Sequence, residues 1–226
     1  MTRPRVAICV AASLDGKLAT AARDPVTFPS RADRARLFAL RDAADALLVG
    51  AGTIRAEDPP LLPDAARRAA RRRAGRGPAP LRVVVSRSLD LPLGRALVAD
   101  PASPVVVLTA PQAPEPAAAR LRAAGCEVVR LPGPELLAAG LELLAARHGV
   151  RDVLCEGGGD LNARVLAAGL AERLHLTLCP VVLGGAGAPT LADGPGFALA
   201  AAPRATLEAC ERVGDELFLT YRLTPR

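Results

Sequence analysis

The sequence predicts an α/β fold: a mostly parallel, twisted sheet with helices on both faces and an antiparallel edge. Apolar runs of strand length alternate with helix-length segments along most of the chain, which is the pattern of the βα units that build parallel sheets. From about residue 172 onward, strand-like runs follow one another closely, which favours antiparallel pairing. A length of 226 residues allows one large α/β domain or two small ones, and we expect residues 1–226 to form a single domain.

The expected elements follow from hydrophobic period and turn residues. Buried strands are expected at residues 6–12, 46–49, 81–85, 105–108, 127–130, 153–155, 172–178, 181–183 and 217–223, the last of these as the closing edge strand. Helices are expected at residues 30–43, 115–124, 134–147 and 161–168. Gly125 and Gly149 follow two of these helices and Pro134 starts one, as is typical of helix ends. The Arg/Ala/Gly/Pro-rich stretch at 64–80 is expected to be a loop.

Composition limits the possible partners. The net charge is +6, almost all of it from arginine, which suits either a basic surface or attraction to a phosphorylated molecule. Aromatic residues make up only 2% of the chain, so base-stacking platforms are scarce and we expect no nucleic-acid binding. No apolar run approaches the roughly 20 residues of a membrane helix, so we expect no membrane span.

The cysteines and histidines give no sign of a metal site. The five cysteines are scattered, with no CxxC or Cys/His spacing, so we expect no metal ligands and a reducing, cytoplasmic setting. The two histidines, His148 and His175, are far apart, and His175 alternates with leucines in a strand. A hydrogen-bonded structural role fits His175 better than a catalytic one.

Glycine-rich turns follow buried strands and are candidate anion sites. Gly50-Ala51-Gly52-Thr53 follows the strand at 46–49, and Gly157-Gly158-Gly159 follows the strand at 153–155. Such glycines let backbone N–H groups approach a phosphate, although tight strand-to-helix turns need glycine as well. Neither segment is a GxGxxG, so a Rossmann fingerprint is absent. A third cluster at 184–187 is equally consistent with a phosphate loop or with close backbone packing.

Charged groups lie beside these turns. Glu156 precedes the triple glycine at a buried strand end, where a carboxylate is costly unless it is paired or used. Glu57-Asp58-Pro59 follows the first turn, and the Asp-Pro step by itself can be a simple turn former. Ser13-Leu14-Asp15-Gly16-Lys17 ends the first strand, and Lys17 can be either a functional cation or a solvated one.

Taken in order, four segments resemble the reductase domain of the bacterial riboflavin deaminase-reductase and its stand-alone archaeal and fungal relatives: residues 13–17, 48–59, 155–162 and 180–185. The segment 188–197 resembles the stand-alone members most. This resemblance implies a dihydrofolate-reductase-like fold, a single reductase domain, a homodimer, and NADPH as hydride donor. It implies reduction of a phosphoribosylaminopyrimidine to its ribitylamino product. No deaminase segment accompanies it.

Site residues are carried over by position. The resemblance implies cofactor contacts at Ala11, Thr53, Glu57, Asp58, Gly158, Gly159, Asp160 and Leu161, and we add Gly50, Gly52 and Gly157 from the same turns. It implies substrate contacts at Arg41, Leu61 and Glu156, and we add Ser13. Lys17 stands at the basic position of the first motif. Candidates for proton handling are Lys17, Asp58 and Glu57.

Three departures separate this chain from the family pattern. Glu57-Asp58-Pro59 replaces the usual Asp-Asp-Pro, and Ser86-Arg87 replaces a common Asp-Ser after the third strand. Arg87 is therefore a candidate for the 2′-phosphate of NADPH. A substrate-facing arginine is missing near Asp64, so phosphate binding is expected from Arg41, Arg31 or the arginines at 67–76.

The expected reaction delivers a hydride to ribose C1′ of a ring-opened imine and a proton to its nitrogen, with Glu156 orienting the pyrimidine amino groups. The sequence leaves a 2-amino and a 2-oxo pyrimidine open as substrate. Two other readings remain: another reductase of the same fold, such as a dihydrofolate reductase, and a non-catalytic NADPH-binding protein.

Overall fold

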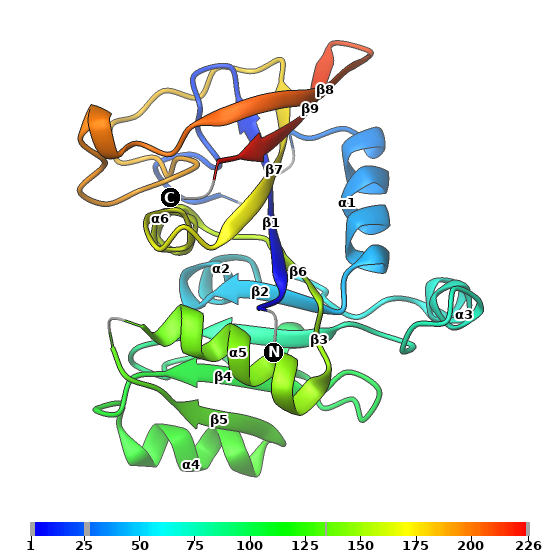
Figure 1. Cartoon of the computed structure of the whole chain (residues 1–226), viewed down its shortest axis with the longest axis vertical. Helices are drawn as coiled ribbons and strands as arrows, with labels where there is room; N and C mark the ends of the chain where they lie inside the picture. The colour runs from blue at the N-terminus through cyan, green and yellow to red at the C-terminus, as the bar shows by residue number, and fades with distance from the viewer. Residues whose placement is uncertain (1–2, 25–27, 134, 225–226) are drawn as a thin grey trace. The chain divides into compact units, whose positions relative to one another are not determined.

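The computed structural model describes residues 3–24, 28–133 and 135–224. The chain groups into two compact units, one formed by Met1–Pro4 and Leu40–Leu154 and the other by Arg5–Ala39 and Cys155–Arg226. Figure 1 shows the path of the chain through each unit. The prediction of a single domain over residues 1–226 stays a prediction.

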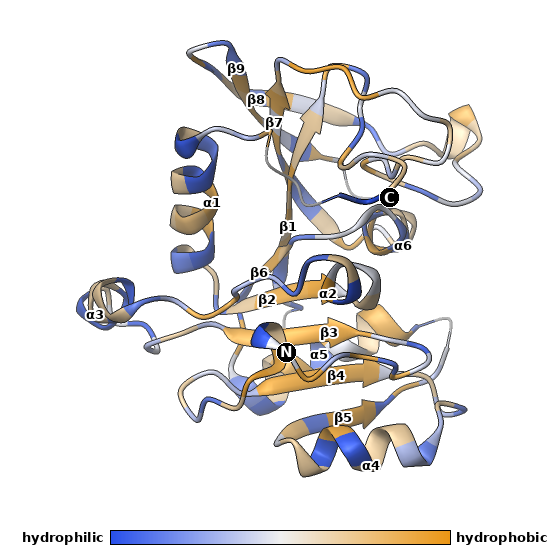
Figure 2. Ribbon diagram, turned by 180° about the vertical axis from the view of Figure 1, so that it is seen from behind, coloured by the Kyte–Doolittle hydropathy of each residue, from blue (hydrophilic) through white to orange (hydrophobic). Residues whose placement is uncertain are grey.

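The first unit is a parallel sheet with helices on both faces. Its strands are β2 (Ala46–Gly50), β3 (Leu81–Val85), β4 (Val105–Thr109), β5 (Cys126–Arg130) and β6 (Asp152–Cys155), in the order β5-β4-β3-β2-β6. The last residue of β6 belongs to the second unit. Its helices are α2 (Ala51–Glu57), α3 (Ala65–Arg73), α4 (Glu115–Ala123) and α5 (Leu136–His148), with a short 3₁₀ helix at Arg95–Leu97. Figures 1 and 2 show α5 on one face of the strands and α2 on the other.

The central strands of this unit, β2, β3 and β4, contain almost no charged residue because both of their faces are covered. β4 is buried along its whole length, and Figure 2 shows β2, β3 and β4 in the hydrophobic colour. The exception is Arg82 in β3, which is 0% exposed. Its guanidinium donates to the carbonyls of Ala96, Val98 and Ser103. This buried cation therefore holds the segment between β3 and β4 in place.

The second unit contains the antiparallel edge. Its strands are β1 (Arg5–Ser13), β7 (Ala171–Cys179), β8 (Ala205–Val213) and β9 (Glu216–Leu223), in the order β1-β7-β9-β8. β1 and β7 are parallel, while β7–β9 and β9–β8 are antiparallel. Helix α6 (Gly159–Ala167) and a 3₁₀ turn at Leu199–Ala201 complete it. The predicted fold class, mostly parallel with an antiparallel edge, is confirmed.

Helix α1 (Arg31–Ala43) runs from the second unit into the first. Within the second unit it is fixed by Arg36, whose guanidinium donates to the carbonyls of Leu176 and Leu219 and lies 5.0 Å from the ring centroid of Phe218. On the same strands, His175 Nδ1 lies 3.1 Å from Thr220 Oγ1, as expected of a structural histidine.

Two sequence predictions of strands were wrong. Residues 181–183 form no strand, because the backbone turns at Pro180 and its groups bond to the loop after β1; Leu14 N–H, for example, donates to Val181 O at 2.8 Å. The predicted closing strand β9 is not the edge, since β8 lies outside it. Residues 205–212 are all exposed, so β8 has no apolar alternation by which it would be recognised.

The predicted loop at 64–80 was also wrong in part, because it contains helix α3. Asp64 caps this helix by accepting the Arg67 N–H at 2.8 Å. Its arginines bond to the protein: Arg67 pairs with Asp42, Arg68 pairs with Asp100, and buried Arg71 donates to four main-chain carbonyls. Most of the basic run thus holds the helix against its own unit.

The described residues contain no helix long and apolar enough to cross a bilayer. Over the same residues, no group of three or more His, Cys, Asp or Glu side chains is placed to hold a metal ion. Pro134, the predicted start of the helix at residues 134–147, lies outside the described residues.

Candidate active site

The loop after β1 is held by the Ser13 hydroxyl. Ser13 is 0% exposed, and its Oγ donates to Asp15 Oδ1 at 2.6 Å and accepts the Lys17 N–H at 2.8 Å. Ser13 N–H also donates to Lys17 O, and Gly16 takes a positive φ of 79° that closes the turn. The hydroxyl of Ser13 is therefore used inside the loop. This arrangement favours a supporting role for Ser13 over the predicted substrate contact.

Asp15 joins this loop to the loop after β7. Its two carboxylate oxygens accept the N–H groups of Leu183 at 3.0 Å and Gly184 at 2.7 Å. The hydrogen bond from Ser13, followed by that from Leu183, lowers the pKa of Asp15 to about 2. Asp15 is thus a permanent anion that ties two loops together, a role that its Asp-Gly turn signal did not reveal.

Lys17 is fixed by its main chain, while its ammonium is free to act. Its main chain forms a β-bridge with Thr190, and the next residue donates from its N–H to Pro189 O at 2.8 Å. The side chain is partly exposed, and its ammonium has no partner in the described part of the chain. Of the three predicted proton-handling residues, Lys17 has the geometry most suited to that role.

The glycine loop between β6 and α6, residues 157–159, needs glycine for packing against neighbouring side chains as well as for any ligand. Gly157 has φ +72°, and a Cβ there would crowd the Asn162 side chain. A Cβ on Gly159 would overlap the Asp193 carboxylate and Thr190 O. Two of the three glycines are therefore required by packing. The Gly157–Gly158 peptide bond is cis.

Asp193 connects the glycine loop to the Lys17 loop. Its Oδ1 accepts the N–H and the hydroxyl of Thr190 at 2.9 and 2.8 Å, and its own N–H donates to Gly159 O at 3.1 Å. Because Thr190 also bridges Lys17, Lys17 and Gly159 belong to one hydrogen-bonded assembly. Neither Asp193 nor Thr190 was among the predicted site residues, since nothing in their spacing marks this contact.

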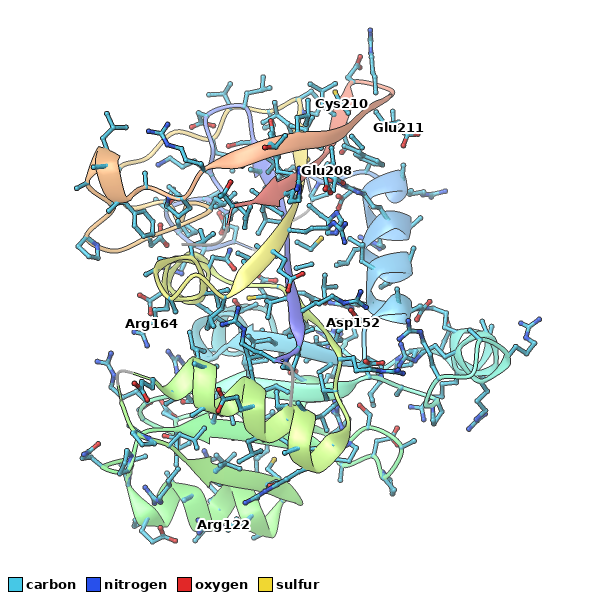
Figure 3. All side chains as sticks on the ribbon, viewed as in Figure 1. Arg122, Asp152, Arg164, Glu208, Cys210 and Glu211 are labelled. Carbon is cyan, nitrogen blue, oxygen red and sulfur yellow. The ribbon has the colours of Figure 1, made fainter. Side chains whose placement is uncertain are left out.

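The start of α6 offers backbone N–H groups. Gly158 precedes the helix with no side-chain cap, a configuration that leaves N-terminal N–H groups for an anion. Asp160 is exposed, and its Oδ2 lies 3.1 Å from Nη2 of Arg164, one turn later in α6. Figure 3 labels Arg164 on this helix. Leu161 is buried, so its side chain belongs to the core.

Two further residues complete the predicted set in the second unit. Glu156 is partly exposed directly after β6, which leaves its side chain within reach of solvent. Beside it, burial raises the pKa of the Cys155 thiol to about 12, so this cysteine is inert at neutral pH. Ala11 is partly exposed in β1, opposite Thr177 of β7.

In the first unit, the turn after β2 has an open face. Gly50 pairs with Val85 of β3 and precedes α2, which contains Thr53 and the exposed Glu57. Gly52 is exposed, does not have a positive φ, and a Cβ there would meet nothing within 4 Å. Neither backbone conformation nor packing explains this glycine.

Asp58 caps the 3₁₀ helix at Arg95–Leu97. Its Oδ2 and Oδ1 accept the N–H groups of Arg95 and Ala96, both at 2.8 Å. A Cβ on Gly94 would overlap this carboxylate. Burial by itself would raise the pKa of Asp58, but the hydrogen bonds from Ala96 and Arg95 outweigh it and leave the pKa below its usual value. A carboxylate so satisfied is a poor proton donor.

Arg41 and Leu61 lie in the interior of the first unit. Arg41 is 5% exposed and donates to Pro60 O at 2.9 Å, and Leu61 is 2% exposed. These positions favour structural roles over the predicted substrate contacts. Arg87, by contrast, is exposed on the turn after β3 and has no partner among the described residues.

Comparison with known proteins gives a consistent result. The chain is 34% identical over 221 residues to a 2,5-diamino-6-ribosylamino-4(3H)-pyrimidinone 5′-phosphate reductase of Archaeoglobus fulgidus, covering 97% of this chain and 98% of that protein. It is 31% identical to the riboflavin biosynthesis protein RibD of Bacillus amyloliquefaciens, but spans only 57% of it.

Solved structures confirm the expected dihydrofolate-reductase-like fold, which RibD reductase domains share. A pyrimidine reductase-like protein from Corynebacterium diphtheriae matches with a TM-score of 0.83 at 23% identity, covering 99% of this chain and 93% of that one. Residues 4–219 match the family described as the RibD C-terminal domain. This chain therefore belongs to the RibD C-terminal domain family.

Proposed function

We propose that this protein is a reductase of riboflavin biosynthesis that uses NADPH to convert the ribose of 2,5-diamino-6-ribosylamino-4(3H)-pyrimidinone 5′-phosphate into a ribityl chain. The observation that carries the proposal is the assembly in which Asp15, Thr190 and Asp193 hold Lys17 and the glycine loop together. It presents a free ammonium on a rigid loop, as proton transfer to a bound substrate requires.

The choice of the 2-amino pyrimidine rests on the end-to-end similarity to the Archaeoglobus reductase, whose name specifies that compound. The bifunctional RibD relative is matched over only 57% of its length. The similarity to the Archaeoglobus reductase over nearly all of both chains supports reduction of the diamino compound over reduction of a deaminated one.

The residues present fit a nicotinamide dinucleotide. In the first unit, Gly52 leaves open space and Arg87 has no partner among the described residues. In the second unit, α6 begins without a side-chain cap. Each unit has its own set of proposed dinucleotide contacts. In the first unit we propose Gly50, Gly52, Thr53, Glu57 and Arg87, and in the second unit Ala11, Gly157, Gly158, Gly159, Asp160 and Leu161. When bound, NADPH supplies the hydride for ribose C1′.

The chain supplies orientation and a proton. The Lys17 ammonium donates a proton to the nitrogen of the ring-opened imine, because it is the predicted acid for which the described residues supply no partner. Glu156 accepts hydrogen bonds from the pyrimidine amino groups and orients the ring. Asp15 and Ser13 keep the Lys17 main chain in place. Asp58, which is ionised and capped onto Arg95 and Ala96, supports the first unit and transfers no proton.

We also propose that the protein is a homodimer of the reducing cytoplasm. β8 is an edge strand with residues 205–212 exposed, and Leu207 is 50% exposed. Figure 3 labels Glu208, Cys210 and Glu211 along this strand. A two-fold copy that covers this strand removes the unpaired edge. The free cysteines suit a reducing compartment.

The function is tested by following oxidation of NADPH or NADH with purified protein. Each is offered with the 2-amino pyrimidine, the 2-oxo pyrimidine and dihydrofolate. Turnover of the 2-amino compound is the expected result. Turnover of the 2-oxo compound alone places the enzyme after deamination and contradicts the substrate choice. Turnover of dihydrofolate alone, or cofactor binding without any turnover, overturns the riboflavin assignment.

A further inference from the structure

The segment at 188–193 lies between the loop after β1 and the start of α6, all within the second unit. On the side of the loop after β1, Leu18 N–H donates to Pro189 O at 2.8 Å. The next residue of the segment, Thr190, forms a β-bridge with Lys17. The segment is therefore bonded directly to the main chain that presents the Lys17 ammonium.

Asn162 joins this segment to α6. The asparagine is 0% exposed, and its Nδ2 donates to Leu191 O at 3.0 Å. Its other side faces the glycine loop and β6, since a Cβ on Gly157 would crowd the amide and Cys155 Sγ donates to Asn162 Oδ1 at 3.5 Å. This buried amide therefore contacts the glycine loop and the segment at 188–193 together, and neither can shift without the other.

Asp193 makes a second connection to α6. Its N–H donates to the carbonyl of Gly159, the first residue of the helix, at 3.1 Å. Its Oδ1 accepts the N–H and the hydroxyl of Thr190, at 2.9 and 2.8 Å. The carboxylate also fills the space in which a Cβ of Gly159 would stand. The main chain that begins α6 and the main chain that bridges Lys17 thus pack on one side chain.

Two ligands that order connected segments influence each other's binding. A ligand that fixes one segment lowers the entropy cost that a second ligand must meet when it fixes the other. An anion held by the N–H groups at the start of α6 fixes the glycine loop, and the contacts of Asn162 and Asp193 extend that order to the loop after β1. A ligand held beside Lys17 acts in the opposite direction by the same factor, because linkage is reciprocal.

We propose that Asn162 and Asp193 couple the two ligands of this unit. A dinucleotide bound at the start of α6 strengthens binding of the phosphorylated pyrimidine beside Lys17, and the pyrimidine strengthens binding of the dinucleotide equally. Both side chains are positioning residues, because they act through the segment at 188–193. The inference rests on the proposed function and deepens it, since it assigns the means by which each ligand controls the affinity for the other.

The coupling is measured in a complex that cannot turn over, in which NADP⁺ replaces NADPH. Calorimetry gives the Kd of NADP⁺ with and without saturating 2-amino pyrimidine, and the Kd of the pyrimidine with and without saturating NADP⁺. We expect wild type to bind each ligand about 5- to 20-fold more tightly when the other is present. The two ratios must agree, because both measure one coupling free energy.

Substitutions of the two positioning residues separate coupling from binding. Asp193→Ala and Asn162→Ala are each expected to reduce the ratio to less than about two-fold, while each ligand alone binds within about three-fold of wild type. Asp193→Asn retains an oxygen that can accept from Thr190, so it should keep most of the coupling. Asp215→Ala removes an exposed partner of Arg212 in the same unit and serves as the control, with the wild-type ratio expected.

Amide hydrogen exchange provides a readout that needs no pyrimidine. NADP⁺ is expected to slow exchange at the Lys17 and Leu18 amides by about five-fold or more in wild type, and by less than about two-fold in Asp193→Ala. If no pyrimidine binds while this protection is present in wild type and lost in the variant, the coupling stands and only the proposed reaction fails.

Three results overturn the proposal. The first is a wild-type ratio of one, or absence of any NADP⁺-dependent protection at Lys17 and Leu18 in wild type. The second is a ratio that Asp193→Ala and Asn162→Ala leave unchanged. The third is weaker binding of both ligands with the ratio intact, which assigns the two side chains a structural role alone.

Discussion

At the residue scale, Asp15 provides the clearest link between a loop and catalysis. In Asp15→Asn, one carboxylate oxygen becomes an NH₂ group that cannot accept from Leu183 or Gly184. We expect kcat to fall about 10-fold or more with a smaller change in cofactor affinity, because the Lys17 loop loosens while the nucleotide contacts stay. Glu115→Gln, which weakens an exposed ion pair with Arg122 away from the proposed contacts, is the control. Unchanged kcat in Asp15→Asn contradicts the role.

The hydrogen bonds that Asp15 accepts from Leu183 and Gly184 depend on pH in a direction that its pKa fixes. The folded pKa of Asp15 is lowered to about 2 from its usual value of 3.8, so its contribution is present above about pH 4 and is lost as the pH falls through about 2. The acid limb of the rate profile above pH 4 must therefore belong to another group. A rate profile of Asp15→Asn that keeps the wild-type acid limb, at a lower plateau, is the expected result.

Asp58 and Gly94 form a pair that a double-mutant cycle can isolate. Gly94→Ala places a methyl group on the Asp58 carboxylate, so we expect a loss of about 1–3 kcal/mol in the free energy of unfolding. In the Asp58→Ala background the obstacle is gone, and the same substitution should cost about 1 kcal/mol or less. Urea unfolding of the four proteins measures this coupling. Additive losses contradict the contact.

Sequence reasoning identified chemistry-bearing residues better than their roles. Lys17, Glu156 and the glycine turns stood out because charge and glycine at strand ends are unusual. The same reasoning gave Asp58, Arg41 and Leu61 functional roles that their burial and hydrogen bonds do not favour. Asn162 and Asp193 were missed because their roles depend on contacts with residues that are distant or unmarked in the sequence. Asn162 donates to Leu191 O, and Asp193 bonds to Thr190 and Gly159.

At the element scale, most strands and helices were predictable because they follow a hydrophobic period. β3 was predicted at its observed bounds, Leu81–Val85, and α1 within one residue of Arg31–Ala43. α3 was predicted as a loop because it has no apolar helical period apart from alanine. The residue that it buries is an arginine, Arg71. β8 was missed because a strand exposed on both faces carries no apolar signal, and only its pairing with β9 defines it.

His175 makes the antiparallel edge sensitive to mild acid. Burial, followed by the charges of Arg36 and Arg173, lowers the pKa of His175 to about 4. The unfolded chain therefore binds more protons between about pH 6.5 and 4, and stability falls with pH through that window. We expect wild type to lose about 1–2 kcal/mol more than His175→Gln between pH 7 and pH 5 in urea unfolding. His148→Gln is the control, and equal losses in wild type and His175→Gln contradict the account.

At the scale of the whole molecule, the proposed homodimer makes β8 an interface. Leu207→Asp places a charge on the exposed strand, and we expect it to convert the dimer to a monomer in light-scattering measurements at micromolar concentration. Leu93 is also 50% exposed but lies in the first unit, so Leu93→Asp is a matched control that should leave the dimer intact. A wild-type monomer, or dissociation by both substitutions alike, contradicts the assignment of β8.

The contact between Gly159 and Asp193 has a consequence for the history of the family. Position 159 cannot gain a side chain while Asp193 holds Thr190 against it. Once a side chain fills that space, the Asp193 carboxylate can no longer occupy its present position, and selection for the acid is relaxed. The two positions should therefore be inherited as a pair. Among relatives, any chain with a larger residue at the first position is expected to have lost the acid at the second, although 33 residues of sequence separate them here.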